Sequence, residues 1–296
     1  MDQADKLRKI MNTNIIKDEE NLNKENKAKV ISISSGKGGV GKTNFAINFS
    51  ISLSRLNYKV VIIDADIGLS NIEILAGVNM NYTLADIVLS DKTIFDIMGN
   101  GPEGIKIISG GSGLKELKLF DNDNILKLMK EIENLQSTVD YIIIDTGAGI
   151  SPAVTDFIMT SSELIVVCTP DPTSLMDSYT LIKSVIHTEY KGHISVVTNL
   201  VSGRNEGKEI YTKLSNTSNN FLGVQVDYLG YIERNELVTQ GIRNQIPFTV
   251  SHPNSPISKR INTMAMNFLD NQALVKKDIK LSFAKKIFDI FSRRGD

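Results

Sequence analysis

Features that mark several protein classes are scarce in this sequence of 296 residues. It contains a single cysteine, Cys168, which argues against an iron–sulfur carrier because such proteins need several cysteine ligands. Cys168 stands in the apolar run 164–168, so we expect a buried and chemically inert thiol. The three histidines, His187, His193 and His252, lack the spacing of a metal site.

Long apolar runs and an excess of charge are also missing. The sequence has no stretch of about twenty apolar residues and no secretory signal, so we expect an intracellular protein without a transmembrane helix. Its 33 Lys and Arg nearly balance its 34 Asp and Glu, and the formal net charge of −1 argues against general nucleic-acid binding. The 41% hydrophobic content is enough for one large α/β domain with a substantial core.

What the sequence does contain is a phosphate-binding loop pattern, G-x-x-x-x-G-K-[ST], between a strand-like run at 30–33 and a helical pattern over 43–56. A strand, a glycine-rich turn and a helix N-terminus aim several backbone N–H groups at one phosphate. Lys42 is then placed to reach the β- and γ-phosphates of ATP, and the Thr43 hydroxyl to bind Mg²⁺. The loop residues expected to contact the nucleotide are Gly36, Lys37, Gly38, Gly39, Val40, Gly41, Lys42 and Thr43.

Two further apolar runs, 59–64 and 140–145, end in acids. Continuous Ile and Val runs are typical of parallel strands buried on both faces. Because ligands of open α/β sheets lie beyond the carboxyl ends of the strands, we expect the two acids that end these runs, Asp64 and Asp145, to point toward the phosphate loop. Asp145 is the acid suited to Mg²⁺ or its water ligands. A single acid after a strand is also common as a helix cap or turn residue.

The rest of the chain continues the alternation of strands and helices. We expect strands at 105–109, 164–169, 194–199 and 228–232, and helices at 121–135, 152–161 and 173–187. This order predicts a single doubly wound, mainly parallel sheet with helices on both faces, of the P-loop NTPase type. We assign residues 29–270 to this domain, 1–28 to an N-terminal helix and linker, and 271–296 to a C-terminal helix.

A second lysine, Lys37, follows the first glycine of the loop, where a phosphate loop acting alone does not require one. The pattern K-G-G-x-G-K-T resembles the deviant Walker-A family that includes the MinD and ParA ATPases. The resemblance implies a slow regulatory ATPase in which Lys37 crosses an ATP-dependent homodimer to the partner's phosphates, Lys42 acts in its own site, and Asp66 orients the attacking water. The alternative for Lys37 is an ordinary solvated surface lysine.

The same resemblance suggests where the adenine base would be bound. Relatives use an asparagine after a late strand and the loop after the next strand. Asn199 and the pair Glu233 and Arg234 occupy these places. Asn199 serves equally well as a helix cap or turn residue.

The N-terminal segment points to one family among the MinD-like ATPases. A D-Q-A-x-x-L-R motif joined to a MinD-like ATPase resembles the FlhG family of flagellar number and placement regulators, as does the D-T-G-A-G sequence at 145–149. The likeness implies binding and stimulation of the signal-recognition-type GTPase FlhF, and contacts to flagellar basal-body and C-ring components. A terminal helix without a function is the alternative. The residues that carry the motif are Asp2, Gln3, Ala4, Leu7 and Arg8.

The C-terminal segment 278–294 has apolar residues on one broad helical face and basic residues around it. Such a helix is able to lie in an anionic membrane surface, as the C-terminal helices of MinD-like proteins do, and two helices of a dimer would bind more tightly than one. The alternative is that this face packs on the protein's own sheet. The residues expected to enter the membrane are Ile279, Phe283, Ile287, Ile290 and Phe291.

These features favour a cytoplasmic ATPase switch that attaches reversibly to the inner face of the cell membrane and controls flagellum number or placement. The alternative within the same superfamily is a ParA-type partition or MinD-type division-site ATPase. A partition protein would need a basic DNA-binding surface, which the charge balance does not favour. A scaffold that binds ATP and barely hydrolyses it differs from the first interpretation only in turnover.

Overall fold

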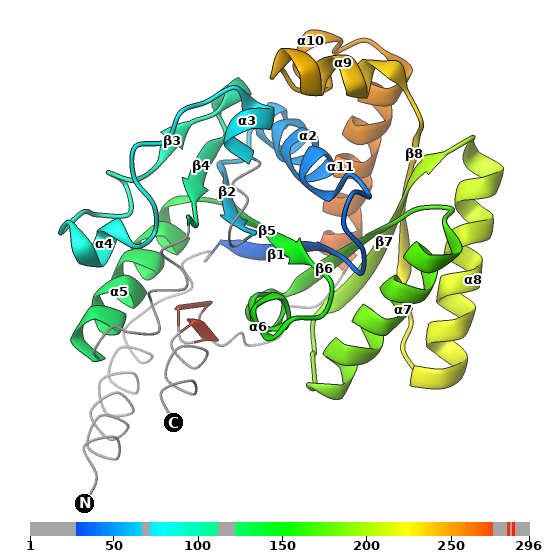
Figure 1. Ribbon diagram of the computed structural model, residues 1–296, viewed down its shortest axis with the longest axis horizontal. Coiled ribbons are helices and arrows are strands. Elements are labelled where there is room, and N and C mark those ends of the chain that lie inside the picture. The colour runs from blue at the N-terminus through cyan, green and yellow to red at the C-terminus, as the bar shows by residue number, and fades with distance from the viewer. Residues whose placement is uncertain (1–27, 67–71, 112–121, 275–282, 285, 288–296) are drawn as a thin grey trace, which may run out of the picture.

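A computed structural model describes residues 28–66, 72–111, 122–274, 283–284 and 286–287, and Figure 1 shows their arrangement. An eight-stranded sheet runs through the centre in the order β3-β4-β2-β5-β1-β6-β7-β8. Every neighbouring pair is parallel except β3 with β4. The strands are β1 (Lys29–Ser35), β2 (Val60–Ala65), β3 (Gly99–Asn100), β4 (Lys106–Ser109), β5 (Tyr141–Ala148), β6 (Glu163–Cys168), β7 (His193–Val201) and β8 (Asp227–Glu233).

Helices cover both faces of this sheet (Figure 1), which confirms the predicted doubly wound fold. The α2 and α11 helices pack on one face, and α5, α6, α7 and α8 pack on the other. The helices are α2 (Lys42–Arg55), α3 (Ile72–Ala76), α4 (Asp86–Leu89), α5 (Asn122–Thr138), α6 (Pro152–Thr160), α7 (Pro172–His187), α8 (Arg204–Leu222), α9 (Glu236–Asn244), α10 (Phe248–Ser251) and α11 (Pro256–Leu274), with a 3-10 turn η1 (Pro102–Gly104).

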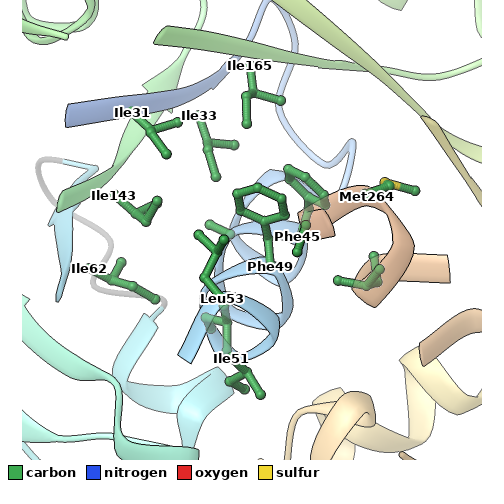
Figure 2. Close-up of a cluster of buried hydrophobic side chains, with 14 of the residues drawn as sticks. Ile31, Ile33, Phe45, Phe49, Ile51, Leu53, Ile62, Ile143, Ile165 and Met264 are labelled. Atoms are coloured by element: carbon green, nitrogen blue, oxygen red, sulfur yellow. The ribbon is translucent and has the colours of Figure 1, made fainter. Parts of the chain in front are cut away.

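Alternate strand residues enter opposite cores, as expected for strands buried on both faces. Ile31 and Ile33 of β1 belong to one cluster with Phe45 and Phe49 of α2, and α11 lies beside α2 on the same face of the sheet (Figure 2). Val30, which precedes Ile31 in the strand, enters the core on the opposite face. The apolar runs of the central strands therefore fix the sheet between two layers of helices.

The C-terminal residues that the structure describes belong to the core on the α5 face. Phe283 and Ile287 are only 4% and 3% exposed and pack in the cluster that contains Leu128 and Ile132 of α5. In this structure both side chains, which we expected in a membrane surface, are covered by the protein itself. Ile279, Ile290 and Phe291 lie outside the described residues. Within the described part of the chain, no helix has both the length and the apolar character needed to cross a bilayer.

Candidate functional site

The phosphate loop joins β1 to α2 at the carboxyl edge of the sheet. Gly39 and Gly41 have φ values of 77° and 85°, a left-handed conformation that favours glycine. A β-carbon on Gly41 would also lie 2.4 Å from the Asn199 side-chain nitrogen. Gly41 is the N-cap of α2, so the loop ends where the unpaired N–H groups of a helix begin. This geometry is suited to phosphate binding.

Lys42, the first residue of α2, forms an ion pair with Asp145 of β5, with 2.7 Å between Nζ and Oδ1. Both side chains are buried, at 7% and 1% exposure. The pKa of Asp145 is raised, chiefly by its burial, and the neighbouring Lys42 and Thr43 side chains offset part of that rise. Its Oδ2 atom is buried without a hydrogen-bond partner. A buried carboxylate oxygen of this kind has an unmet need for a cation or a donor.

These residues fit a Mg²⁺ ion that is shared with a nucleotide. Thr43 and Asp145 meet at one point, and Asp145 Oδ2 is free to accept a metal or its water. Among the residues that the structure describes, no three His, Cys, Asp or Glu side chains gather into a metal site of their own. Mg²⁺ commonly uses one or two protein ligands together with phosphate oxygens, so the site would be completed by the nucleotide.

Lys37 is held by α7 of its own chain. Its Nζ lies 2.6 Å from Asp171 Oδ2 and 2.6 Å from the Thr173 hydroxyl. Asp171 is the N-cap of α7 and also accepts the Thr173 backbone N–H at 3.0 Å. The Lys37 side chain is 41% exposed, so this ion pair lies at the surface. The second lysine is therefore paired within one chain and accessible to solvent at the same time.

Asp66 follows the end of β2, and its Oδ1 lies 3.4 Å from where a β-carbon on Gly147 would be. It is therefore close to the end of β5, and it adds to the negative charge around Asp145. Asp64, the acid that ends the run 59–64 and that the sequence predicts beside the phosphate loop, is only 3% exposed. Burial, followed by the charge of Asp145, raises the pKa of Asp64 to about 6.

A cavity of about 620 Å³ lies between the phosphate loop and the carboxyl ends of β6, β7 and β8. Lys37 and Val40 of the loop line it together with Leu200 and Arg234. The cavity is within the size range of small-molecule sites and adjoins the phosphate loop, as the nucleoside part of a nucleotide would require.

Two of the residues expected at adenine have other contacts. The Asn199 amide donates to the Val40 carbonyl at 2.7 Å, beneath the loop, and its side-chain oxygen accepts the Leu200 backbone N–H at 2.8 Å. Glu233 accepts a hydrogen bond from Arg260 of α11 at 3.0 Å. In this structure Asn199 supports the phosphate loop, Glu233 ties β8 to α11, and Arg234 lines the cavity.

The sequence profile of the ParA family, described as NUBPL iron-transfer P-loop NTPase, matches residues 26–269. The chain belongs to the ParA family of P-loop NTPases. That description names iron transfer, but the single cysteine of this ParA-family chain is fully buried. Burial raises the pKa of the Cys168 thiol to about 12, which leaves it protonated and a poor ligand.

Two curated relatives match most of this ParA-family chain. The antiactivator FleN of Pseudomonas aeruginosa is 30% identical over 236 residues, which are 80% of this chain and 84% of FleN. The flagellum site-determining protein YlxH of Helicobacter pylori is 33% identical over 292 residues, which are 96% of this chain and 97% of YlxH. The predicted resemblance to MinD/ParA ATPases of the flagellar regulator type is confirmed.

Solved structures of MinD share the fold. The cell division ATPase MinD of Pyrococcus furiosus has a TM-score of 0.66 at 22% identity and covers 82% of this chain and 99% of its own. The septum site-determining protein MinD of Pyrococcus horikoshii, complexed with Mg-ADP, has a TM-score of 0.66 at 24% identity and covers 85% of this chain and 100% of its own. The N-terminal residues Asp2, Gln3, Ala4, Leu7 and Arg8 lie outside the part that the structure describes.

Proposed function

We propose that this protein binds and hydrolyses ATP with Mg²⁺, dimerises when ATP is bound, and acts as a membrane-associated switch that regulates flagellum number or placement. The observation that carries the proposal is the phosphate loop with a second, surface-accessible lysine. Lys42 is buried in the site, whereas Lys37 is 41% exposed and only paired to an equally exposed aspartate. A buried lysine serves its own site, and an exposed one is able to reach a second molecule.

The chemistry follows from charge and position. The N–H groups at the start of α2 would bind the β-phosphate, and Lys42 would turn from Asp145 toward the β- and γ-phosphate oxygens. Thr43 and Asp145 would hold Mg²⁺, which supplies positive charge at the phosphates. Asp66 would orient the attacking water and accept its hydrogen bond. Phosphoryl transfer depends mostly on such positioning and charge stabilisation, so no covalent role is needed from the protein.

Lys37 would exchange partners during this cycle. Exposed ion pairs are individually weak, so the triphosphate of a second protomer is a strong competitor for the lysine that Asp171 holds. On dimerisation Lys37 would leave Asp171 and Thr173 and stabilise the charge on the partner's γ-phosphate. Neither protomer alone would then have a complete site, which explains why hydrolysis would wait for the dimer.

The flagellar role rests on the relatives. FleN is named an antiactivator and YlxH a flagellum site-determining protein, and the YlxH likeness extends over 96% of this chain. The N-terminal motif at 2–8 is the feature that resembles FlhG, so we assign it to stimulation of an FlhF-type GTPase. Flagellar basal-body and C-ring components would be further partners, and the protein would act in the cytoplasm.

Membrane attachment would require the C-terminal helix to leave the core. Phe283 and Ile287 are buried in the structure, and exposing an apolar side chain of this size costs about 1.5–3 kcal/mol. A membrane surface would restore that burial, and two helices in an ATP-bound dimer would bind together more tightly than one. Attachment would therefore be reversible and depend on ATP.

The test is the change Lys37→Ala in the full chain, studied by light scattering and ATP turnover with ATP, with ADP and without nucleotide. We expect the variant to bind ATP yet to remain monomeric and to lose most of its turnover. The control is Lys213→Ala, which removes another exposed lysine whose partner, Glu209, is 2.7 Å away and on the same helix. A Lys37→Ala variant that dimerises and hydrolyses ATP like the wild type would refute the proposal.

A further inference from the structure

The α2 helix lies in an apolar core, yet it carries three polar side chains along one of its sides. Asn48, Ser52 and Arg55 follow one another at spacings of four and three residues, so they share one face of the helix. Asn48 and Ser52 are each only 1% exposed. Burying polar groups this deeply is costly unless their hydrogen bonds are made. The partners of these three residues therefore identify the elements that this face of α2 holds.

Two of the three side chains bind one residue of α10. Asn48 Oδ1 accepts the backbone N–H of Thr249 at 3.0 Å and the Thr249 hydroxyl at 2.8 Å. Arg55 Nη1 donates to the Thr249 carbonyl at 2.9 Å. The third side chain, Ser52, donates to Asn262 Oδ1 of α11 at 2.7 Å. Thr249 is fully buried, and each of its polar atoms is bonded to α2, so α10 is fixed to this helix.

From α10 the contacts continue to the wall of the cavity beside the phosphate loop. The preceding helix, α9, packs tightly on α10, because a β-carbon on Gly241 would lie 2.8 Å from the Ile246 carbonyl oxygen and 3.3 Å from the Phe248 backbone nitrogen. Contacts this close make α9 and α10 move as one unit. The N-cap of α9 is Asn235, which directly follows Arg234 in the wall of the cavity.

The two sides of the cavity are thus joined through Thr249. On one side, the phosphate loop runs into α2 at Lys42. On the other side stands Arg234, whose backbone N–H donates to the Val201 carbonyl at 3.0 Å. The place of α10 against α2 sets the separation of these two sides. A ligand that spans the cavity depends on that separation, whereas a ligand confined to the phosphate loop does not.

We propose that Asn48 and Thr249 are positioning residues for nucleotide binding, which set the separation between the phosphate loop and the Arg234 wall of the cavity. This rests on the proposed function, in which the cavity holds the nucleoside part of ATP. Both residues act through α10 and α9 and need no contact with the nucleotide. Buried polar networks whose hydrogen bonds are made favour one arrangement of the elements that they join.

The first experiment compares two ligands, Mg²⁺–ATP and Mg²⁺–tripolyphosphate, by calorimetry on the full chain. Thr249→Val keeps the shape of the side chain and removes the hydroxyl donor. We expect it to raise the Kd of ATP about fivefold and that of tripolyphosphate less than about twofold, because tripolyphosphate occupies only the phosphate loop. Thr249→Ser keeps the hydroxyl and should bind both ligands as the wild type does. Equal weakening of both ligands, or unchanged ATP binding, in Thr249→Val would overturn the proposal.

A double-mutant cycle tests whether the two residues act as one contact. Asn48→Ala removes the acceptor of both Thr249 bonds, so it should weaken ATP binding at least as much as Thr249→Val does. The double variant should bind ATP no more weakly than Asn48→Ala alone, since the hydroxyl has already lost its acceptor. Additive losses would show that Thr249 acts independently of Asn48 and would overturn the proposal.

The matched control is Ser54→Ala, which removes another hydrogen bond from α2. The Ser54 hydroxyl donates to the Glu103 carbonyl in η1 at 2.8 Å, away from α10. We expect both affinities to stay at the wild-type value. In hydrogen–deuterium exchange, Thr249→Val should speed exchange in 234–251 and leave β5 unchanged. Faster exchange in β5 as well would show a general loss of stability and overturn the positioning role.

These measurements also separate the inference from the proposed function. A wild-type protein that does not bind ATP would refute the proposed function and this inference together. A wild-type protein that binds and hydrolyses ATP, beside a Thr249→Val variant with the same preference for ATP over tripolyphosphate, would refute the inference alone.

Discussion

Both lysines of the phosphate loop are paired with carboxylates of their own chain. Lys42 lies 2.7 Å from Asp145 in the interior, and Lys37 lies 2.6 Å from Asp171 at the surface. The two pairs differ in how easily they separate, because an exposed pair is screened by water and salt and a buried pair is not. Nucleotide binding would rearrange the Lys42 pair, whereas a second protomer would rearrange the Lys37 pair.

A change at Asp171 tests whether its contact with Lys37 restrains the monomer. Asp171→Asn removes the negative charge and keeps an N-cap acceptor for the Thr173 N–H, so α7 should stay intact. We expect the ATP-bound dimer to form at a few-fold lower protein concentration, because Lys37 no longer has to leave an ion pair. Light scattering across a series of protein concentrations measures this shift.

The control for that change is Glu209→Gln, which removes the partner of Lys213 on α8, another exposed pair of similar length at 2.7 Å. Its dimerisation should match the wild type. Dimerisation of Asp171→Asn that is unchanged or weaker would show that the pair does not oppose the dimer.

At the scale of elements, the amino ends of four parallel strands meet in one polar cluster. His193 begins β7, and its Nδ1 and Nε2 lie 2.9 Å from Glu163 of β6 and 2.9 Å from Asp227 of β8. Lys29 of β1 is 2.8 Å from Glu163 as well. The hydrogen bond to Glu163 is the largest cause that raises the pKa of His193. Burial acts to raise the pKa of Glu163, but the hydrogen bond with His193 and the charge of Lys29 outweigh it and lower that pKa.

This cluster predicts a pH dependence of stability. The contribution of His193 is fully present below its unfolded pKa of 6.5 and is lost as pH rises through the raised folded value. The contribution of Glu163 is present above its unfolded pKa of 4.5 and is lost as pH falls through the lowered folded value. The cluster therefore stabilises the fold most between these two unfolded values.

Urea unfolding of the wild type and His193→Gln measures this effect. The free energy of unfolding of the wild type should exceed that of His193→Gln by about 1 kcal/mol near pH 5.5, and the difference should shrink near pH 9. The difference is small because His193 is partly exposed to solvent. The variant Glu189→Gln, on the loop after α7, should show no such trend. A difference that grows with pH would contradict the assigned pairing.

The C-terminal residues on the α5 face make a separate prediction. Phe283 and Ile287 are almost fully buried, so Phe283→Ala or Ile287→Ala should lower the free energy of unfolding by about 2–5 kcal/mol. Phe221→Ala is the control, because Phe221 is 76% exposed and should change stability by about 0.5 kcal/mol or less. Equal stability of all three variants in urea titrations would show that the C-terminal residues do not pack on the core in solution.

The elements that the sequence predicts best are those with continuous apolar runs or a motif. The strands around the phosphate loop and the helix after it were predicted because Ile and Val runs and the G-x-x-x-x-G-K-T pattern are local signals. The helices α8, α9 and α11 were not predicted. In α8 the polar stretch at 215–220 has weak helix formers, and its helical state depends on the packing of Ile210 and Leu214 against the sheet.

The site residues also divide into those whose places follow from local sequence patterns and those whose contacts depend on the fold. Lys42 forms an ion pair with Asp145, and Asp66 lies beside Gly147 of the same strand, because the carboxyl ends of parallel strands meet at one edge of the sheet. Asn199 was assigned to adenine by likeness, yet its amide lies on the Val40 carbonyl, a contact 159 residues apart in sequence. Asp64 was expected at the same edge of the sheet, but its hydrogen bonds with the backbone N–H groups of Asp66 and Ile72 are identified only by the fold. Long-range contacts of this kind have no local signature.

At the scale of the whole molecule, both ends of the described chain meet in one apolar cluster. Ala28, the first described residue, is buried beside the strands that also receive Phe283 and Ile287. The nucleotide site lies at the carboxyl ends of the strands, and β1 connects the two regions directly, since it begins at this cluster and ends at the phosphate loop. A conformational change in the phosphate loop would therefore act on one end of β1, and the release of either terminal segment from the apolar cluster would act on its other end.

The N-terminal segment provides the test of the flagellar role. The sequence predicts a polar linker around 18–29, of which Lys29 begins β1 in the structure, between residues 2–11 and the ATPase domain, so we expect the segment to act without the rest of the chain. Ala4 and Leu7 are three residues apart and would lie on one side of a helix. A synthetic peptide of residues 2–11 should raise the GTP hydrolysis rate of the cognate signal-recognition-type GTPase, measured as phosphate release.

Two variants within the motif, one control variant outside it, and the comparison of the peptide with the full chain test whether the motif itself stimulates the GTPase. Gln3→Ala or Leu7→Asp in the full chain should remove the stimulation of GTP hydrolysis, while ATP turnover by the same variants stays normal because the nucleotide site is unchanged. Lys9→Ala, outside the D-Q-A-x-x-L-R motif, should stimulate as the wild type does. If the full chain stimulates the GTPase and the peptide does not, the activating surface lies on the ATPase domain, whose exposed helices would then be the place to search for it.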